Sequence, residues 1–221
     1  MAIQAGTEKA EIRRSRTGLK PSGPPAPRCG PHTYRCPSSR DYGSITRACC
    51  RRHIIDLTIT IGEALNEEGI LWWADYGTLL GAARHGDIVP WDKDADLGVL
   101  YEDWDACRKV MKAVCAKNRF HLRIRSRRHS MKIALSEINR TNVDIFFWQE
   151  KEDGTLFRAA YASSDRYKGR EFPKEWLGDM TTLPFAGFEV NAPHYWKRLL
   201  NHRYGSKWHK PIRANNDGVP R

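Results

Sequence analysis

Apolar residues recur at the spacing of an amphipathic helix in three parts of the chain. In residues 45–68 the apolar positions are Ile54, Ile55, Leu57, Ile61 and Leu65, and the remaining faces carry arginines and glutamates. In residues 102–117 they are Trp104, Cys107, Val110, Met111 and Val114. A shorter helix is predicted over residues 194–204, with Tyr195, Leu199 and Leu200 turned inward.

Short apolar or alternating runs predict strands between these helices. The runs cover residues 70–76, 94–101, 119–126, 130–136 and 141–148, and a turn with a short strand is expected at 182–188. The run Val143–Trp148 is apolar except for Asp144. Burying an acid among apolar residues costs free energy unless it has a partner, so Asp144 should pair with a nearby arginine or bind a metal ion.

The two ends of the chain lack a core-forming pattern. Residues 1–28 are rich in Ala, Gly, Ser and Pro and predict a disordered leader, and residues 215–221 predict a tail. With 221 residues the chain is long enough for one domain of ordinary size, which we expect at residues 51–214.

Residues 29–50 predict a loop that is poor in aliphatic residues and needs a covalent or metal staple. The loop contains four cysteines, Cys29, Cys36, Cys49 and Cys50. Four thiolates could complete a zinc shell, but the usual pair of C-x₂-C motifs is absent, and the spacing leaves disulfides and reduced thiols open. Cys107 and Cys115 fall on the second helix, where small buried side chains are expected.

The net charge of +11 indicates which classes of partner the chain could bind. A basic chain favours anionic partners: nucleic acid, an anionic membrane surface or a phosphate-bearing substrate. No apolar run approaches the roughly 18 residues of a membrane span, so neither an anchor nor a signal peptide is visible.

The candidate chemistry lies in residues 76–99, where glycines, acids and bases stand between apolar runs. Gly77 allows a sharp turn and the close approach of a phosphate, and Thr78 is expected to cap a short helix. Gly81 would allow close packing of that helix. Arg84 is suited to a bidentate phosphate contact.

Three acids are candidate metal ligands. Asp94 and Asp96 point to one face of a strand and repel each other unless a cation lies between them, for which Mg²⁺ or Mn²⁺ is usual. Asp144 is the candidate third ligand, and it could also take the proton of an attacking hydroxyl. An EF-hand interpretation starting at Asp92 fails, because Leu97 stands where that loop needs glycine.

The segment resembles the LicD family of phosphosugar and phosphocholine transferases. The resemblance rests on Gly77-Thr78-Leu79-Leu80-Gly81, Arg84-His85-Gly86, Pro90-Trp91-Asp92 and Asp94-x-Asp96, with Val89 before the proline. The cysteine spacing and the runs at 172–173, 183–188 and 192–193 are similar to the fukutin and fukutin-related protein branch, so the likeness spans about residues 29–206. It implies an α+β fold with a nucleotidyltransferase-like mixed β-sheet flanked by helices and an N-terminal zinc-binding loop.

The resemblance also implies an activity: metal-dependent transfer of ribitol 5-phosphate from CDP-ribitol to a glycan hydroxyl of α-dystroglycan type, with release of CMP. In that interpretation the Mg²⁺ or Mn²⁺ ligands are Asp94, Asp96 and Asp144. The donor-binding residues are Gly77, Thr78, Arg84, Trp91, Asp92 and Lys93. The ligands of a structural Zn²⁺ are Cys29, Cys36, Cys49 and Cys50.

The family further implies a Golgi lumenal setting, although the anchor and stem of its eukaryotic members are not seen in this chain, and it leaves homo-oligomerisation open. Asn139-Arg140-Thr141 is an N-glycosylation sequon that would need such a setting. Transfer of phosphocholine or glycerol phosphate is the alternative within the family. A nucleic-acid-binding domain is the alternative of another class, but the basic run 119–128 lacks the interleaved aromatic residues of stacking platforms. An inactive relative is disfavoured, because the acids and glycines are intact.

Overall fold

The computed structural model describes residues 46–124, 130–159 and 170–210. In chain order the elements are α1 (Ala48–Glu67), β1 (Trp72–Ala74), α2 (Tyr76–His85), β2 (Asp94–Leu100), η2 (Tyr101–Asp103), α3 (Trp104–Asn118), β3 (His121–Ile124), β4 (Ser130–Ala134), β5 (Asn142–Glu150), β6 (Thr155–Arg158), β7 (Phe172–Pro173), η5 (Lys174–Trp176), β8 (Thr181–Phe185), β9 (Phe188–Ala192) and α4 (Trp196–Tyr204).

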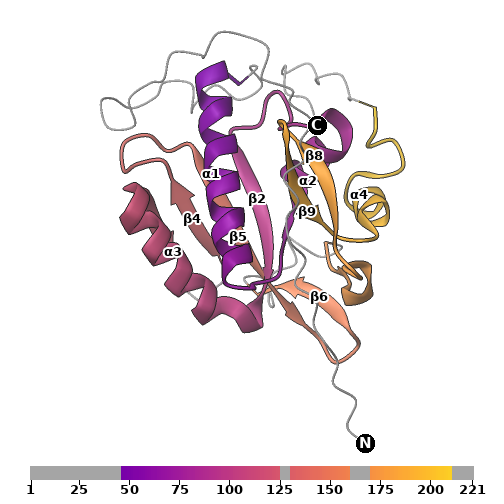
Figure 1. The fold of residues 1–221 in the computed structure, drawn as a ribbon. Coiled ribbons are helices and arrows are strands. Elements are labelled where there is room, and N and C mark those ends of the chain that lie inside the picture. Colours follow the sequence, from indigo (N-terminus) through magenta and orange to yellow (C-terminus); the bar gives the residue numbers. More distant parts are fainter. Residues whose placement is uncertain (1–45, 125–129, 160–169, 211–221) are drawn as a thin grey trace, which may run out of the picture.

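A mixed sheet forms the centre of the fold (Figure 1). Its strand order is β1-β2-β5-β4-β3, and β6 and β7 extend it beside the end of β5. The two central strands β2 and β5 are parallel, whereas β1, β4 and β6 pair with them in the antiparallel direction. The fold is therefore α+β with a mixed sheet, as the sequence resemblance implied.

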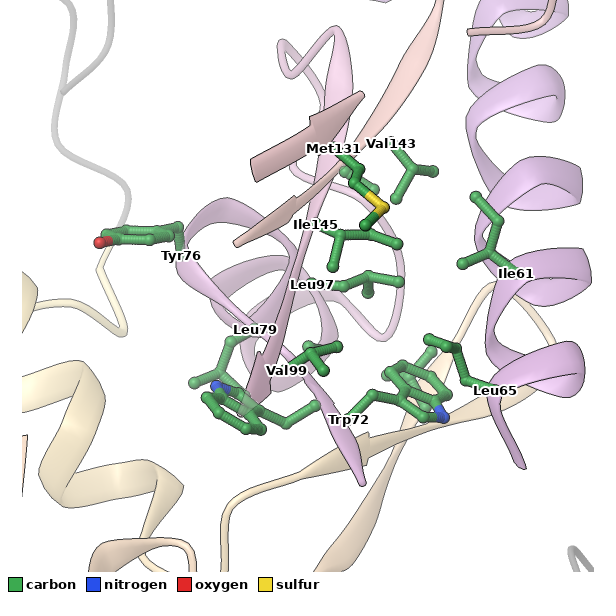
Figure 2. Packing of buried hydrophobic residues seen from close by; sticks show 14 of the residues in the cluster. Ile61, Leu65, Trp72, Tyr76, Leu79, Leu97, Val99, Met131, Val143 and Ile145 are labelled. Atoms are coloured by element: carbon green, nitrogen blue, oxygen red, sulfur yellow. The ribbon is translucent and has the colours of Figure 1, made fainter. Parts of the chain in front are cut away.

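One face of the sheet carries the main apolar core, covered by α1 and α3 (Figure 1). Figure 2 shows Ile61 of α1 facing Leu97 of β2 and Ile145 of β5, and all three side chains are fully buried. The ring of Trp104 in α3 contacts Phe147 of β5 at a centroid distance of 4.5 Å. Because side chains alternate along a strand, the residues between these point to the other face.

The other face is covered by α2 and α4, and the β8–β9 hairpin packs beside the edge strand β1, where it contacts α1 and α2 (Figure 1). Trp73 of β1 lies directly over Gly98 of β2, where an added Cβ would come within 2.2 Å of the indole. Gly81 likewise brings α2 against the chain that follows it, because its Cβ would lie 2.4 Å from Asp87 O. The predicted role of Gly81 in close packing is confirmed.

The long helices and central strands agree with their sequence predictions, but three expectations were wrong. The strand predicted at 70–76 is shorter, because Tyr76 already belongs to α2. Tyr195 is not turned inward and is 40% exposed. Phe172–Pro173, where the sequence analysis predicted no strand, forms β7 with Phe172 buried at 1% exposure. Cys107 and Cys115 are buried in α3, as predicted.

Several predictions concern residues outside the described ranges. These are the disordered leader at 1–28, most of the cysteine-rich loop including Cys29 and Cys36, the basic residues 125–128 and the tail at 215–221. Among the described residues, no helix is both long enough and apolar enough to cross a membrane.

Candidate active site

Three of the candidate acids lie together on the face of the sheet away from α1. Asp96 of β2 is the register partner of Asp144 of β5, and Asp94 is the partner of Asn142. All four residues point to the same face, because they alternate with Ala95, Leu97, Val143 and Ile145 of the core. The parallel pairing of β2 and β5 thus joins acids that are about 50 positions apart in the sequence.

The first turn of α2 lies against this cluster. A Cβ added to Gly77 would lie 2.5 Å from Asp92 Oδ2 and 3.7 Å from Asp96 Oδ2. Any larger residue would have to displace the Asp92 carboxylate, so glycine is needed for the close approach. Asp92, one of the donor-binding residues that the resemblance implies, therefore lies between α2 and the acids of β2.

Thr78 has a different role from the one predicted. The N-cap of α2 is Asp75, whose Oδ1 accepts a hydrogen bond from Tyr76 N at 3.0 Å. Thr78 Oγ1 instead accepts from Asp96 N at 2.7 Å. The threonine thus fixes the backbone of β2 at the candidate ligand, and the expectation that it caps the helix was wrong.

The cluster carries an excess of negative charge. Burial and then the neighbouring Asp94 raise the pKa of Asp92 to about 7, although Arg84 opposes the shift. Burial and then Asp144 raise the pKa of Asp94. Burial and then the other acids of the cluster, Asp94 first, raise the pKa of Asp96 well above its ordinary value. A cation bound among these groups would relieve both the desolvation and the repulsion.

The donor set fits Mg²⁺ or Mn²⁺. Asp94, Asp96 and Asp144 offer hard oxygen ligands on one face, and Gly77 brings the first turn of α2 close to the carboxylates of Asp92 and Asp96. Among the residues that the structure describes, no group of three or more acidic, histidine or cysteine side chains is arranged so that it could hold a metal ion as it stands. The fit therefore rests on the shared face, the ligand chemistry and the unrelieved repulsion.

Two basic residues border the acids. Lys132 of β4 pairs with Asp144, with Nζ 2.9 Å from Oδ2. The partner is therefore a lysine, where the sequence analysis had considered an arginine. Arg84 of α2 donates from Nη1 to Trp208 O at 3.1 Å, and its guanidinium lies 5.8 Å from the ring centroid of Trp91. Trp91, Asp92 and Arg84 thus gather beside the acids, and Lys93, also half-buried, connects them to β2.

Sequence analysis missed two residues that hold this site in place. Asp75 is fully buried and accepts from Trp148 Nε1 at 3.0 Å, and it forms an ion pair with Arg203 of α4. Its own N–H donates to Asp96 O at 2.9 Å. Asp75 had a signal in the sequence, as an acid directly before a glycine turn. Arg203 had none, because it is 128 positions away.

Tyr204 brings a phenol to the same region. Burial raises the pKa of Tyr204, and the charges of Asp96, Asp75 and Asp92 raise it further, against the opposing effect of Arg203. Tyr204 itself is 38% exposed, and its phenol stays un-ionised at neutral pH. With Arg84 bound to Trp208, α4 and the residues after it form one border of the site.

The start of α1 contacts the site loop. Thr46 N donates to Pro90 O at 2.7 Å, and Thr46 Oγ1 donates to Asp92 O. Arg51 pairs with Asp87, with Nε 3.0 Å from Oδ1. Cys49 and Cys50 lie in the first turn of α1. The hydrogen bonds of Thr46 therefore hold this end of α1 next to Pro90 and Asp92. Zinc binding stays a prediction, because the other two cysteines lie outside the described residues.

Comparison with known proteins finds several relatives, among them two kinds of ribitol 5-phosphate transferase. Ribitol 5-phosphate transferase FKRP of Mus musculus is 31% identical over 189 residues, which are 80% of this chain and 38% of the mouse protein. Ribitol-5-phosphate transferase FKTN of Homo sapiens is 24% identical over 177 residues, 79% of this chain and 37% of that protein. The chain thus spans less than two fifths of the length of these relatives.

A solved structure, that of ANT(2")-Ia in complex with adenylyl-2"-tobramycin, is similar with a TM-score of 0.42 and 16% identity over 63% of this chain and 68% of that one. The family model described as LicD/FKTN/FKRP, nucleotidyltransferase domain, matches residues 69–195, which include α2, β2 and β5. Because this match covers more than half of the chain, the chain belongs to the LicD/FKTN/FKRP family.

Proposed function

We propose that this chain transfers ribitol 5-phosphate from CDP-ribitol to a glycan hydroxyl and releases CMP. Family membership and the names of the relatives support the reaction class. The observation that carries the proposal is the pairing of Asp96 with Asp144 across two parallel strands, in front of the glycine turn of α2. Phosphoryl transfer from a diphosphate requires carboxylates that bind a metal ion and, beside them, N–H groups that bind phosphate. The N-terminus of a helix supplies such N–H groups.

The proposed reaction is an in-line displacement at the phosphorus that bears ribitol. The acceptor oxygen forms a bond to this phosphorus, the bond to the bridging oxygen breaks, and CMP leaves with that oxygen's electron pair. The proton of the acceptor hydroxyl passes to a carboxylate, for which Asp144 is our candidate. When bound, Mg²⁺ or Mn²⁺ supplies neutralisation of the charge on the transferred group and the leaving group.

Each residue of the site has a separate role in this proposed reaction. Asp94, Asp96 and Asp144 would hold the metal ion. The first turn of α2, where Gly77 has no side chain, would offer N–H groups to a donor phosphate, and Arg84 would contact a phosphate oxygen. Thr78 and Asp75 keep β2 and α2 in their relative positions through the two hydrogen bonds to the backbone of Asp96.

The test is a comparison of donors. The protein with Mn²⁺ and an O-mannosyl-type glycan acceptor is incubated in turn with CDP-ribitol, CDP-glycerol and CDP-choline, and both CMP and the mass of the acceptor are measured. We expect the fastest release from CDP-ribitol, with a gain of one ribitol phosphate on the acceptor. A preference for CDP-choline or CDP-glycerol would instead support the alternative transferases of the family.

Matched variants make the test specific. Asp94→Asn and Asp96→Asn should lower CMP release by about 100-fold or more, because each removes a ligand charge. Asp105→Asn is the control, since Asp105 is exposed on α3 and, among the described residues, pairs with Arg108 at 3.3 Å. CMP release by Asp94→Asn at the rate of the unchanged protein would refute the metal assignment.

The setting of the reaction is also a proposal. A Golgi lumenal location, the glycan acceptor and a structural Zn²⁺ on Cys29, Cys36, Cys49 and Cys50 are inferred from the family. Zinc analysis of protein purified without chelator tests the last of these: about one Zn²⁺ per chain is expected, and a content near zero would refute it.

A further inference from the structure

Lys132 lies in line with the acids, one strand beyond Asp144. In the sheet register Lys132 of β4 is the partner of Asp144, which is the partner of Asp96. The three side chains thus form a row across β4, β5 and β2 on the face that carries the candidate site. The Lys132 and Asp144 side chains are 23% and 13% exposed, so this ion pair is largely shielded from water.

The ammonium group has a second oxygen partner on the same face. Asn142 is buried and stands two residues before Asp144 on β5. When the amide of Asn142 is turned so that both of its polar atoms find partners, its nitrogen donates to Arg140 O at 2.9 Å and its oxygen accepts from Lys132 Nζ at 3.1 Å. Lys132 Nζ is therefore held by a carboxylate and an amide oxygen. An ammonium has three N–H donors, so one remains for a further acceptor.

The Lys132 ammonium is thus a positive charge surrounded by protein oxygens, as a bound metal ion would be. Phosphoryl-transfer sites with two metals place the ions about 4 Å apart, and carboxylates bridge or flank them. Here the acids Asp94 and Asp96 lie on one side of Asp144, and a fixed positive charge lies on the other. A lysine ammonium is a compact point charge that binds phosphate oxygens well.

We propose that Lys132 Nζ takes the place of a second metal ion, so that the site uses a single divalent ion. This inference rests on the proposed function. Asp94 and Asp96 would hold the divalent ion together with Asp144, and the third N–H of Lys132 would bind an oxygen of the donor diphosphate. Lys132 is thereby a donor-binding residue as well as the partner of Asp144.

The test counts bound Mn²⁺ in the whole chain by electron paramagnetic resonance, with and without CDP. We expect about one Mn²⁺ per chain in the unchanged protein under both conditions. In Lys132→Met the positive charge is gone, and a second Mn²⁺ should bind when CDP is present. Two ions in the unchanged protein with CDP, or one ion in Lys132→Met with CDP, would overturn the proposal.

Controls separate this effect from loss of folding. Lys132→Arg keeps the charge and should keep the count at about one, and Lys112→Met removes an exposed lysine of α3 and should change nothing. Lys132→Met leaves Asp144 without its partner, so thermal unfolding is measured alongside. If that variant does not fold, Lys132→Met combined with Asp144→Asn removes both charges, and it should bind no more than one ion if Asp144 is needed for the second.

The count is independent of turnover. A chain that releases no CMP from any of the three donors but binds one Mn²⁺ would refute the proposed function and leave the role of Lys132 at the metal site intact. A chain that releases CMP but binds two Mn²⁺ would refute the role of Lys132 alone.

Discussion

Arg203, in the last turn of α4, forms a buried ion pair with Asp75, the residue that caps α2. The Arg203 and Asp75 side chains are 3% and 0% exposed. The guanidinium also lies over the ring of Tyr76 at 4.2 Å and near Trp148 at 5.3 Å. Because Asp75 N binds Asp96 O, this pair links the last helix to the strand that carries two of the candidate ligands.

Arg203→Met should destabilise the chain by about 3–5 kcal/mol, because it leaves the Asp75 carboxylate buried without its charge partner. Urea unfolding followed by circular dichroism measures this change. Arg198→Met is the control: Arg198 lies on the same helix, is exposed and contacts only the ring of Tyr195 among the described partners. Combining Arg203→Met with Asp75→Asn should recover part of the loss, and a double variant weaker than both single variants would contradict this account.

Asp96→Asn should stabilise the metal-free protein while it abolishes transfer. The neutral amide removes the charge whose burial, and then whose repulsion by Asp94 and Asp144, raises the pKa of Asp96. A gain of about 1 kcal/mol corresponds to roughly 2–4 °C in Tm for a chain of this size. Thermal unfolding with excess EDTA and then with Mn²⁺ is the measurement. The unchanged protein should gain stability from Mn²⁺ and the variant should gain much less; equal gains would argue against Asp96 as a ligand.

The stability of the metal-free protein should fall as pH rises from about 4 to above 7. The pKa of Asp92 is raised to about 7 in the folded chain, and those of Asp94 and Asp96 are also raised. A carboxyl with a raised folded pKa contributes stability that is fully present below its unfolded pKa and is lost as pH passes its folded pKa. Tm scans in EDTA from pH 5 to pH 8 should show this decline.

Mn²⁺ should flatten that pH dependence, because the bound ion favours the charged carboxylates. Asp92→Asn supplies the comparison: the slope between pH 5 and pH 8 should decrease even without metal. A Tm in EDTA that rises over this interval would contradict the electrostatic description of the cluster.

Gly77→Ala should mainly lower activity, whereas Gly81→Ala should mainly lower stability. At Gly77 the added Cβ meets the Asp92 side chain, which can rotate, so the protein should fold but lose at least about 10-fold in transfer. At Gly81 the Cβ meets backbone atoms of residues 87–89, which cannot move without shifting the loop, so stability should fall by about 1–3 kcal/mol. Transfer activity and unfolding are measured for both variants. Equal losses of activity and of stability in the two variants would contradict this prediction.

Asn139 should not carry a glycan in the folded chain. Its side chain is 1% exposed, and its Oδ1 accepts from Thr141 N at 3.2 Å. Expression in a secretory pathway followed by digestion with peptide N-glycosidase should show no change in mass at this sequon. Asn139→Gln should destabilise the protein by about 1–2 kcal/mol, because the longer side chain cannot keep the local hydrogen bond. A glycan on folded, active protein would overturn the prediction.

The sequence predicted elements well where the pattern was local. Ile54, Leu57, Ile61 and Leu65 repeat at the helical period, and α1 buries all four. The prediction failed where a capping acid or a distant partner decided the outcome. Asp75 and Tyr76 had the apolar surroundings of a strand, yet α2 begins there, because Asp75 accepts from Tyr76 N and is fixed by Arg203.

The acids show the division between sequence and structure most clearly. Because a strand alternates its side chains, the spacing of Asp94 and Asp96 alone determined that they share a face, and the motif around Gly77 identified the family. Only the tertiary structure decided that Asp144 lies opposite Asp96, that Lys132 is its partner and that Arg203 supports Asp75. These contacts join residues 48, 12 and 128 positions apart, and neither burial nor register is encoded by a local spacing.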